Sequence, residues 1–566
     1  MKRMDTWLMG GLTVMLVLIA ILLVNEAIQF NEADGWEPMM NNRLLWGAVG
    51  LALMLGSVAA WRWRTPAQKA AETPTAVTAQ AQQRDYVLEI IGLGVTLDKY
   101  RQSALWETLA KGNAYVTIRE QNPEKYPWTD LDKIGVGGGR QGDSLENGAK
   151  RLPMNWVAPL FNTGPLIRNP AHMETPDLPE TGFGSSVESS GMAWTLFATG
   201  PRRWADRPDR ILDEVFAFFD TNPDVPYIVL TTQDDADEQD NAAPPGTPPL
   251  LRDGHYVTAV PDASALFVLA RRERVDRLRP FVFEEKDYAF QDGDHDHPGP
   301  ARKLFLDYIQ LQQSVPHPRK KRTDGGDTFS QRNPTIEEWL PFAAKFAKRP
   351  DLRESVVSAL NPLDTPRIPS NWQPTPWFPI PWNTFQLQTF DALPTLGYLH
   401  RPTWVKLTDA EGKPLTRRDD RVKAMLDGWQ QALTTLPEAE RKTGPARVIV
   451  GTGDKTDQLL MLHGMLNQYH SQGGPAYDPA KANQFIDTDK RLGNTGAATW
   501  FMQMAIGTMG SYLEGGPSAA INLRDENEAS IMMITPPSEA KRKQQGTAVW
   551  AHKGTPMIDP ANYQQP

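Results

Sequence analysis

Two uncharged apolar runs lie near the start of the chain, at Trp7–Val24 and Leu44–Trp61. Each run is long enough to cross the hydrocarbon core of a bilayer as a helix. The connection between them carries four carboxylates before Arg43, whereas Lys and Arg residues precede the first run and follow the second. Because cytoplasmic loops are enriched in positive charge, the pattern predicts a transmembrane hairpin over residues 1–64 with both ends in the cytoplasm. A cleaved signal peptide is the alternative for the first run.

Beyond these runs the spacing of the apolar positions changes. Residues 65–84 lack apolar periodicity and are rich in Ala, Gln, Thr and Pro, which predicts a flexible linker. Three later segments place an amphipathic helical pattern next to a short apolar run that is typical of a buried strand. They are Asp85–Gly112, Asp206–Thr232 and Arg417–Gly453. Because the pattern recurs, we predict a duplicated, layered α/β body with halves over residues 85–330 and 331–566.

The second half contains a segment in which Pro and Trp alternate, Pro366–Trp382. Pro at this density is incompatible with a regular helix or a central strand. Because Trp side chains are favoured anchors in protein interfaces, one interpretation is a surface that binds a partner protein. The competing interpretation is a belt packed between two domains. The candidates for partner contact are Trp372, Trp377, Phe378 and Trp382.

Two polar stretches resemble ligand-binding loops only in part. GVGGGRQG, which begins at Gly135, lacks the Lys-Ser/Thr pair of a phosphate-binding loop and a strand directly before it, so we predict a mobile loop. DGDHDH contains carboxylates and imidazoles, which can bind a hard or borderline metal, but adjacent ligands converge poorly on one ion. We therefore expect no metal and no cofactor. The weak metal candidates are Asp292, Asp294, His295 and His297.

Composition narrows the function further. The 566 residues carry a formal charge of −9 without a long basic block, which argues against a nucleic-acid partner. The chain has no Cys, so disulfides, thiolate metal sites and Cys nucleophiles are all excluded. Neither G-x-S-x-G nor H-E-x-x-H occurs, which counts against a serine hydrolase or zinc protease of those designs.

Three segments are similar, in the same order, to landmarks of ketosynthases. IIGLGVTLDKYRQSALWETLAKG, from Ile90, resembles the opening strand, Gly-Leu-Gly-Val turn and helix. RVKAMLDGWQQAL, from Arg421, leads to ARVIVGTGD, from Ala446, and resembles the helix and strand that deliver the first catalytic histidine. RLGNTGAATWFMQMAIGTMGSYLEGGPSAAINL, from Arg491, resembles the late turn, helix and closing strand. The resemblance implies a thiolase-like fold.

The departures from that pattern fall on the catalytic positions. Val450 stands where the resemblance places the first histidine, and Asn494 stands where it places the second. Val carries no proton and donates no hydrogen bond, whereas Asn can serve an oxyanion. With no Cys nucleophile, we predict a pseudoenzyme in which GNTGAA survives as a tight turn before a buried helix. The predicted vestigial pocket comprises Val450, Gly451, Asn494, Thr495 and Gly496.

The chain from Asp85 onward also resembles the bacterial type VI secretion lipase-adaptor family, most clearly at GLGVTLDKYRQSALWE. This resemblance implies a non-catalytic adaptor that binds a lipase effector in the cytoplasm and assists its loading onto a secretion spike protein. Together with the apolar runs, it predicts an inner-membrane protein whose body faces the cytoplasm. The alternatives are a membrane-tethered acyl-group or lipid-modifying enzyme with a non-Cys site, and a structural membrane subunit.

Overall fold

The structure is a computed structural model whose chain divides into two units, Met1–Arg84 and Asp85–Pro566. Both predicted membrane spans lie in the first unit, outside the described residues, and so do the weak metal candidates at 292–297. None of the helices in the described ranges is long and apolar enough to cross a membrane. The described residues are 86–126, 129–153, 155–165, 182–185, 195–199, 206–284, 307–308, 310–311, 313–315, 319–321, 327–329, 336–350, 368–375 and 377–552.

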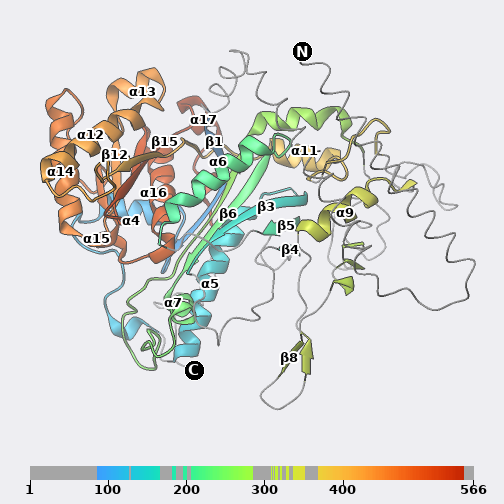
Figure 1. Cartoon of the computed structure of the whole chain (residues 1–566), viewed down its shortest axis with the longest axis horizontal. Helices are drawn as coiled ribbons and strands as arrows, with labels where there is room; N and C mark the ends of the chain where they lie inside the picture. Colours follow the sequence, from blue (N-terminus) through green and yellow to red (C-terminus); the bar gives the residue numbers. More distant parts are fainter. Residues whose placement is uncertain are drawn as a thin grey trace, which may run out of the picture. The chain divides into compact units, whose positions relative to one another are not determined.

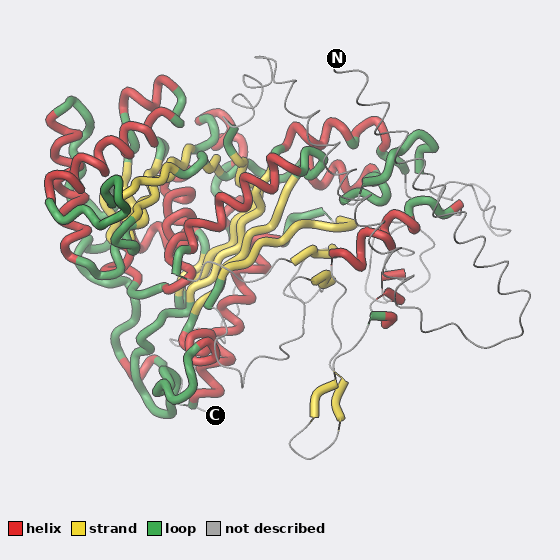
Figure 2. Tube along the Cα trace, viewed as in Figure 1, coloured by secondary structure: helices red, strands yellow, loops and turns green. Residues whose placement is uncertain are grey.

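A thirteen-stranded mixed sheet runs through the described part of the second unit (Figures 1 and 2). In spatial order its strands are β13 (Phe485–Asp487), β12 (Arg447–Gly451), β14 (Ser518–Asn522), β15 (Glu528–Thr535), β10 (Gly397–Leu399), β1 (Leu88–Leu97), β7 (Ala263–Ala270), β6 (Tyr227–Asp234), β3 (Asn155–Thr163), β5 (Thr195–Thr199) and β4 (Gly182–Ser185), with β11 (Thr403–Lys406) beside β15 and β2 (Tyr100–Arg101) beside β1. A separate hairpin joins β8 (Arg319–Lys321) and β9 (Asp327–Phe329). β1 pairs antiparallel with β7 and with β10, which links the two halves of the sheet.

Both faces of the sheet are buried, because side chains alternate between faces along each strand. In β7, Phe267 belongs to a central core and Val268 to a second cluster, which we call the N-terminal outer core. In β12, Ile449 belongs to the central core and Val450 to a third cluster, the C-terminal outer core. Burial on both faces explains why these strands form continuous apolar runs in the sequence.

Helices fill the space between and outside the two parts of the sheet. Helix α16 (Thr499–Glu514) is buried from Thr499 to Tyr512 and contacts both β7 and β12. The central core also contains α4 (Ser103–Lys111) and α6 (Ile211–Thr221). Helix α5 (Asp130–Ala149) packs on β1 and β7, whereas α12 (Arg418–Thr434) and α14 (Thr456–Ser471) cover the opposite outer face. This alternation of helical and sheet layers confirms the predicted layered α/β body.

The remaining helices are short or lie at the margins of these layers. They are α7 (Ala236–Ala242), α9 (Ile336–Phe346), α11 (Thr384–Asp391), α13 (Glu438–Thr443), α15 (Thr488–Leu492) and α17 (Glu539–Gln545). The three helix-and-strand segments predicted from the sequence correspond to β1 with α4, α6 with β6, and α12 with β12. The predicted division into halves at residue 330 stays a prediction.

The prediction of a mobile loop at Gly135 was wrong, because GVGGGRQG lies within α5. The side chain of Thr129 caps the helix by accepting a hydrogen bond from the Asp132 backbone N–H at 3.0 Å. Asp130 and Asp132 occupy the first turn, where negative charge favours the helix dipole. Packing against β1 and β7 then stabilises a helix that its glycines alone would not favour.

Candidate functional site

The residues predicted to form a vestigial pocket lie where two strands end beside the start of α16. Strand β6 ends at Asp234 and β12 ends at Gly451. A short 3-10 turn, η6 (Gly496–Ala498), leads into α16 and touches the end of β6. Ends of sheet strands beside a helix N-terminus are a common place for ligands in α/β proteins.

The part of this pocket around β12 is filled by side chains. Val450 is completely buried in the C-terminal outer core, and its carbonyl accepts a hydrogen bond from Thr488 Oγ1 at 2.8 Å. A Cβ on Gly451 would overlap the side-chain amide of Gln503 and lie 3.1 Å from Thr499 Cγ2. Gln503 is itself fully buried. The side chains of Gln503 and Thr499 therefore occupy the space directly next to Gly451.

Asn494 lies on the other side of the turn and is exposed. Its Oδ1 accepts hydrogen bonds from the Gly496 backbone N–H at 3.1 Å and from Arg524 Nη2 at 3.3 Å. Thr495 next to it is buried and hydrogen-bonds to Thr499 through their hydroxyls at 2.9 Å. Among the residues that the structure describes, no Ser, Asp or His side chain hydrogen-bonds to Asn494. Its carbonyl oxygen stabilises the turn instead.

Asp234 binds the N-terminal turn of the buried helix from within the protein. Its carboxylate accepts a hydrogen bond from the Ala497 N–H at 2.6 Å and from Gln239 Nε2 at 2.7 Å. Gly496 has φ of +50°, and a Cβ there would overlap the Asp234 carboxylate. Burial raises the pKa of Asp234 to about 6, against the opposing effect of these hydrogen bonds. The place where a helix N-terminus binds an external anion is thus taken by this carboxylate.

Arg524 joins the loop after β14 to the same turn. Its Nη1 donates to the Gly496 carbonyl at 2.7 Å and to Thr499 Oγ1 at 2.6 Å. Arg524, Asn494 and Asp234 line an open cavity of about 510 Å³, whose other walls combine Pro and Ala residues with polar residues that include Gln239 and Asp240 of α7. The local sequence gives one signal for Asp234 and Arg524. Asp234 is the last residue of the buried strand β6, and Arg524 lies two positions after the end of the buried strand β14.

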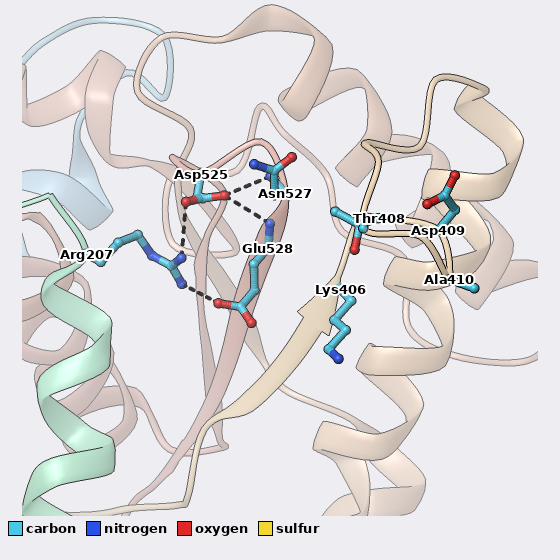
Figure 3. Close-up of a pocket in the computed structure, with 9 residues that line it drawn as sticks. Arg207, Lys406, Thr408, Asp409, Ala410, Asp525, Asn527 and Glu528 are labelled. Atoms are coloured by element: carbon cyan, nitrogen blue, oxygen red, sulfur yellow. Dashed lines mark hydrogen bonds and ion pairs between the residues drawn. The ribbon is translucent and has the colours of Figure 1, made fainter.

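A second cavity, of about 660 Å³, lies between β11 and the loop before β15. Figure 3 shows Arg207 facing Asp525 and Glu528 on one side, with Lys406 and Asp409 on the other. The Arg207 guanidinium lies 3.2 Å from the Asp525 carboxylate and 3.0 Å from that of Glu528. Burial would lower the pKa of Arg207, but its hydrogen bonds with Asp209 and Glu528 and the charge of Asp525 raise it. Arg207 and these two carboxylates therefore form an ionic network in the cavity wall.

Two segments of the chain match models of one protein family. Residues 86–253 match the family described as type VI lipase adapter protein Tla3, N-terminal, and residues 396–536 match its C-terminal counterpart. Together the two matches cover more than half of the chain. The chain belongs to the type VI lipase adapter family.

Solved structures similar to this adapter-family chain include ketosynthases at low identity. A ketosynthase from module 1 of the bacillaene synthase of Bacillus amyloliquefaciens has 9% identity and a TM-score of 0.34, covering 81% of this chain and 77% of its own. The oxazolomycin ketosynthase domain from Streptomyces albus has 9% identity and a TM-score of 0.35, with coverages of 80% and 96%. OleA from Xanthomonas campestris has 9% identity and a TM-score of 0.29, with coverages of 80% and 98%.

The Pro/Trp segment of the adapter lies against the N-terminal outer core. Trp382 is completely buried, and its indole Nε1 donates to Asn155 Oδ1 at 3.0 Å. Phe378 and Trp372 belong to the same core, with exposed fractions of 2% and 6%. Trp377 is half-buried and donates to Asn222 Oδ1 at 3.1 Å. Binding of a partner by these four side chains stays a prediction, but three of the rings face the interior, as the interpretation of a packed belt expects.

Proposed function

We propose that the protein is a non-catalytic adapter that binds a lipase effector in the cytoplasm and assists its loading onto a type VI secretion spike. Membership of the lipase adapter family supports the adapter role. The observation that supports the non-catalytic part is the close packing at Gly451, where a Cβ would already overlap the side-chain amide of Gln503. Val450 lies beneath it and offers no titratable group.

The catalytic alternative requires an accessible nucleophile paired with a base. A hydroxyl group lies near a histidine at the pair of Thr535 and His400, where Oγ1 is 3.1 Å from Nε2. Both residues are nearly completely buried, and burial lowers the pKa of His400 to about 4. Neither residue lines the two cavities described above. This pair therefore gives no support to an acyl-group or lipid-modifying activity.

We further infer that the body is a thiolase-related scaffold attached to the bacterial inner membrane, with the body in the cytoplasm. The alternating helical and sheet layers around α16 support the scaffold, as do the three ketosynthase-like segments in the sequence. The membrane attachment is supported by the apolar runs Trp7–Val24 and Leu44–Trp61 and by the basic residues that flank them.

The proposal is tested by affinity capture with the full chain as bait, expressed in its native bacterial host and extracted in mild detergent. Mass spectrometry should identify a lipase that remains bound through a salt wash. The variant Asn494→Ala should capture the same amount of lipase, because Asn494 is exposed and stabilises only a turn. Recovery of an acyl carrier protein in place of a lipase, or loss of secretion in a folded Asn494→Ala variant, would overturn the proposal.

A further inference from the structure

Helix α5 contains six glycines in its twenty residues, although glycine is among the least favourable residues in a helix interior. Two of them are explained by close contacts on the inner side of the helix. A Cβ on Gly148 would lie 2.7 Å from the side chain of Leu266, and one on Gly137 would lie 3.1 Å from the Asp235 carboxylate. These two glycines let α5 approach β7 and the segment that follows β6.

Three other glycines lie on the outer side of α5, where no such contact exists. Gly135, Gly138 and Gly142 are exposed, and a Cβ at any of them would have no described atom within 4 Å. Leu131 and Ile134 lie on the same side, with 74% and 38% of their surface exposed. Because positions three or four residues apart share one face of a helix, these five residues form one continuous surface. We call it the outer face of α5.

The inner side of α5 is held firmly, so the outer face is presented on a rigid element. Arg140 forms an ion pair with Asp262 at 2.6 Å, and Asp143 forms one with Arg101 at 2.7 Å. Ser144 hydrogen-bonds to the hydroxyl of a residue in β7, Ser264, at 2.5 Å. A preorganised surface of this kind loses little conformational entropy when a partner binds.

The shape of the outer face fits another helix. Glycines permit the backbones of two helices to approach closely, as small residues do at helix–helix contacts in membrane proteins. Leu131 and Ile134 would bracket one end of such a helix, and the exposed apolar surface of Leu131 would be removed from water.

Charge around the exposed end of this face identifies the chemistry of the partner. The carboxylates of Asp130, Asp132 and Asp253 lie near Leu131, where the Asp130 N–H donates to Asp253 Oδ1 at 3.2 Å. Of the two nearby cations, Lys133 turns inward and donates to backbone carbonyls of residues 252 and 254. The other, Arg252, is exposed and lies over the ring of Tyr256. The excess of negative charge favours a partner with Lys or Arg at this position.

We propose that the outer face of α5 is the docking surface for an α-helix of the lipase effector, with small or apolar side chains along its contact side and basic residues near Leu131. This inference rests on the function proposed above, because it assigns the surface through which the adapter binds its lipase. It requires none of the residues of the vestigial pocket.

The test replaces Gly138 and Gly142 in the full chain by a double substitution, Gly138→Gln and Gly142→Gln. Both positions are open, and Gln is a better helix former, so the unfolding temperature of the variant should stay unchanged or rise. The two long side chains would hold a docking helix away from the backbone of α5. Titration calorimetry with the lipase recovered by the unmodified chain should therefore show an affinity at least tenfold weaker. Leu131→Ala should weaken binding in the same direction.

Matched controls remove exposed apolar side chains elsewhere. Phe385 on α11 and Leu460 on α14 have exposed fractions of 54% and 43%, and Phe385→Ala and Leu460→Ala should bind lipase as the unmodified chain does. Equal lipase affinity for the glycine double variant and the unmodified chain would overturn the docking surface while leaving the adapter function intact. Failure of the unmodified chain to bind any lipase would instead refute the proposed function. A change of oligomeric state without a change in lipase affinity would assign this face to self-association and overturn the docking proposal.

Discussion

The buried carboxylate of Asp234 leads to a prediction about stability that can be worked out from the structure. Asp234 has no exposed surface and accepts hydrogen bonds from the Ala497 N–H and from Gln239. Removal from water outweighs these hydrogen bonds and raises its pKa from 3.8 to about 6. The substitution Asp234→Asn keeps the shape of the side chain and an oxygen that can accept from Ala497. It removes the buried charge.

The direction of the pH dependence follows from the raised pKa. Between pH 3.8 and about 6 the folded protein holds a proton at Asp234 that the unfolded chain has lost, so stability falls as pH rises through this window. A shift of about two pKa units corresponds to about 3 kcal/mol, since each unit is worth about 1.4 kcal/mol. We therefore expect Asp234→Asn to raise the free energy of unfolding by up to about 3 kcal/mol at pH 8 and to have little effect near pH 4.

The measurement compares the urea midpoints of unfolding of the natural chain and the variant at pH 4 and pH 8. Asp427→Asn, at an exposed position of α12, is the matched control and should leave the midpoint unchanged at both values. A variant that loses stability equally at pH 4 and pH 8 would refute the reasoning. That result would mean that the hydrogen bond to the Ala497 N–H contributes more than the burial of the charge costs.

Two further predictions concern other buried groups. Trp382→Ala should lower the free energy of unfolding by about 3 to 5 kcal/mol, because it leaves a cavity in the N-terminal outer core. The control Phe385→Ala, at an exposed position of α11, should change it by less than about 0.5 kcal/mol, and thermal unfolding measures both. A Trp382→Ala protein that keeps its stability but no longer binds the lipase would restore a docking role for the Pro/Trp segment. Burial lowers the pKa of His400 from 6.5 to about 4, so the stability that the neutral imidazole contributes is present above pH 6.5 and is lost as pH falls towards 4. In acid unfolding curves, His400→Gln should remove up to about 3 kcal/mol of this pH dependence. An acid midpoint equal to that of the unmodified chain would contradict this prediction.

The sequence predicted those parts of the fold that depend on local apolar patterns. Strand β6 and helix α6 were predicted from such patterns. A strand buried on both faces appears in the sequence as a continuous apolar run, and a helix buried on one side appears as an amphipathic pattern. Helix α5 was missed for the opposite reason, because its glycines oppose helix formation and only contacts with β1 and β7 stabilise it. Intrinsic propensity is a weak guide where tertiary packing decides.

The candidate site shows a similar limit. Asn494 and Gly496 were identified as parts of a turn, but their partners were not. Asp234 meets Ala497 across more than 260 positions of sequence, and no local pattern records a contact of that separation. For the aromatic residues of the Pro/Trp segment, the sequence allows two interpretations. Trp is frequent both at protein interfaces and in cores, and only the burial of the side chain in the structure distinguishes the two.

The geometry at Gly496 also bears on what a short motif can establish. A resemblance at GNTGAA invites a catalytic interpretation, yet Gly496 is required here by the protein's own packing, because any side chain would overlap the Asp234 carboxylate. The same carboxylate takes the N–H of Ala497 that would otherwise be free to bind a ligand. A turn of this sequence therefore has a structural role in this chain, because it joins β6 to the start of the buried helix α16. The glycine of this motif is thus accounted for by the packing of the fold alone.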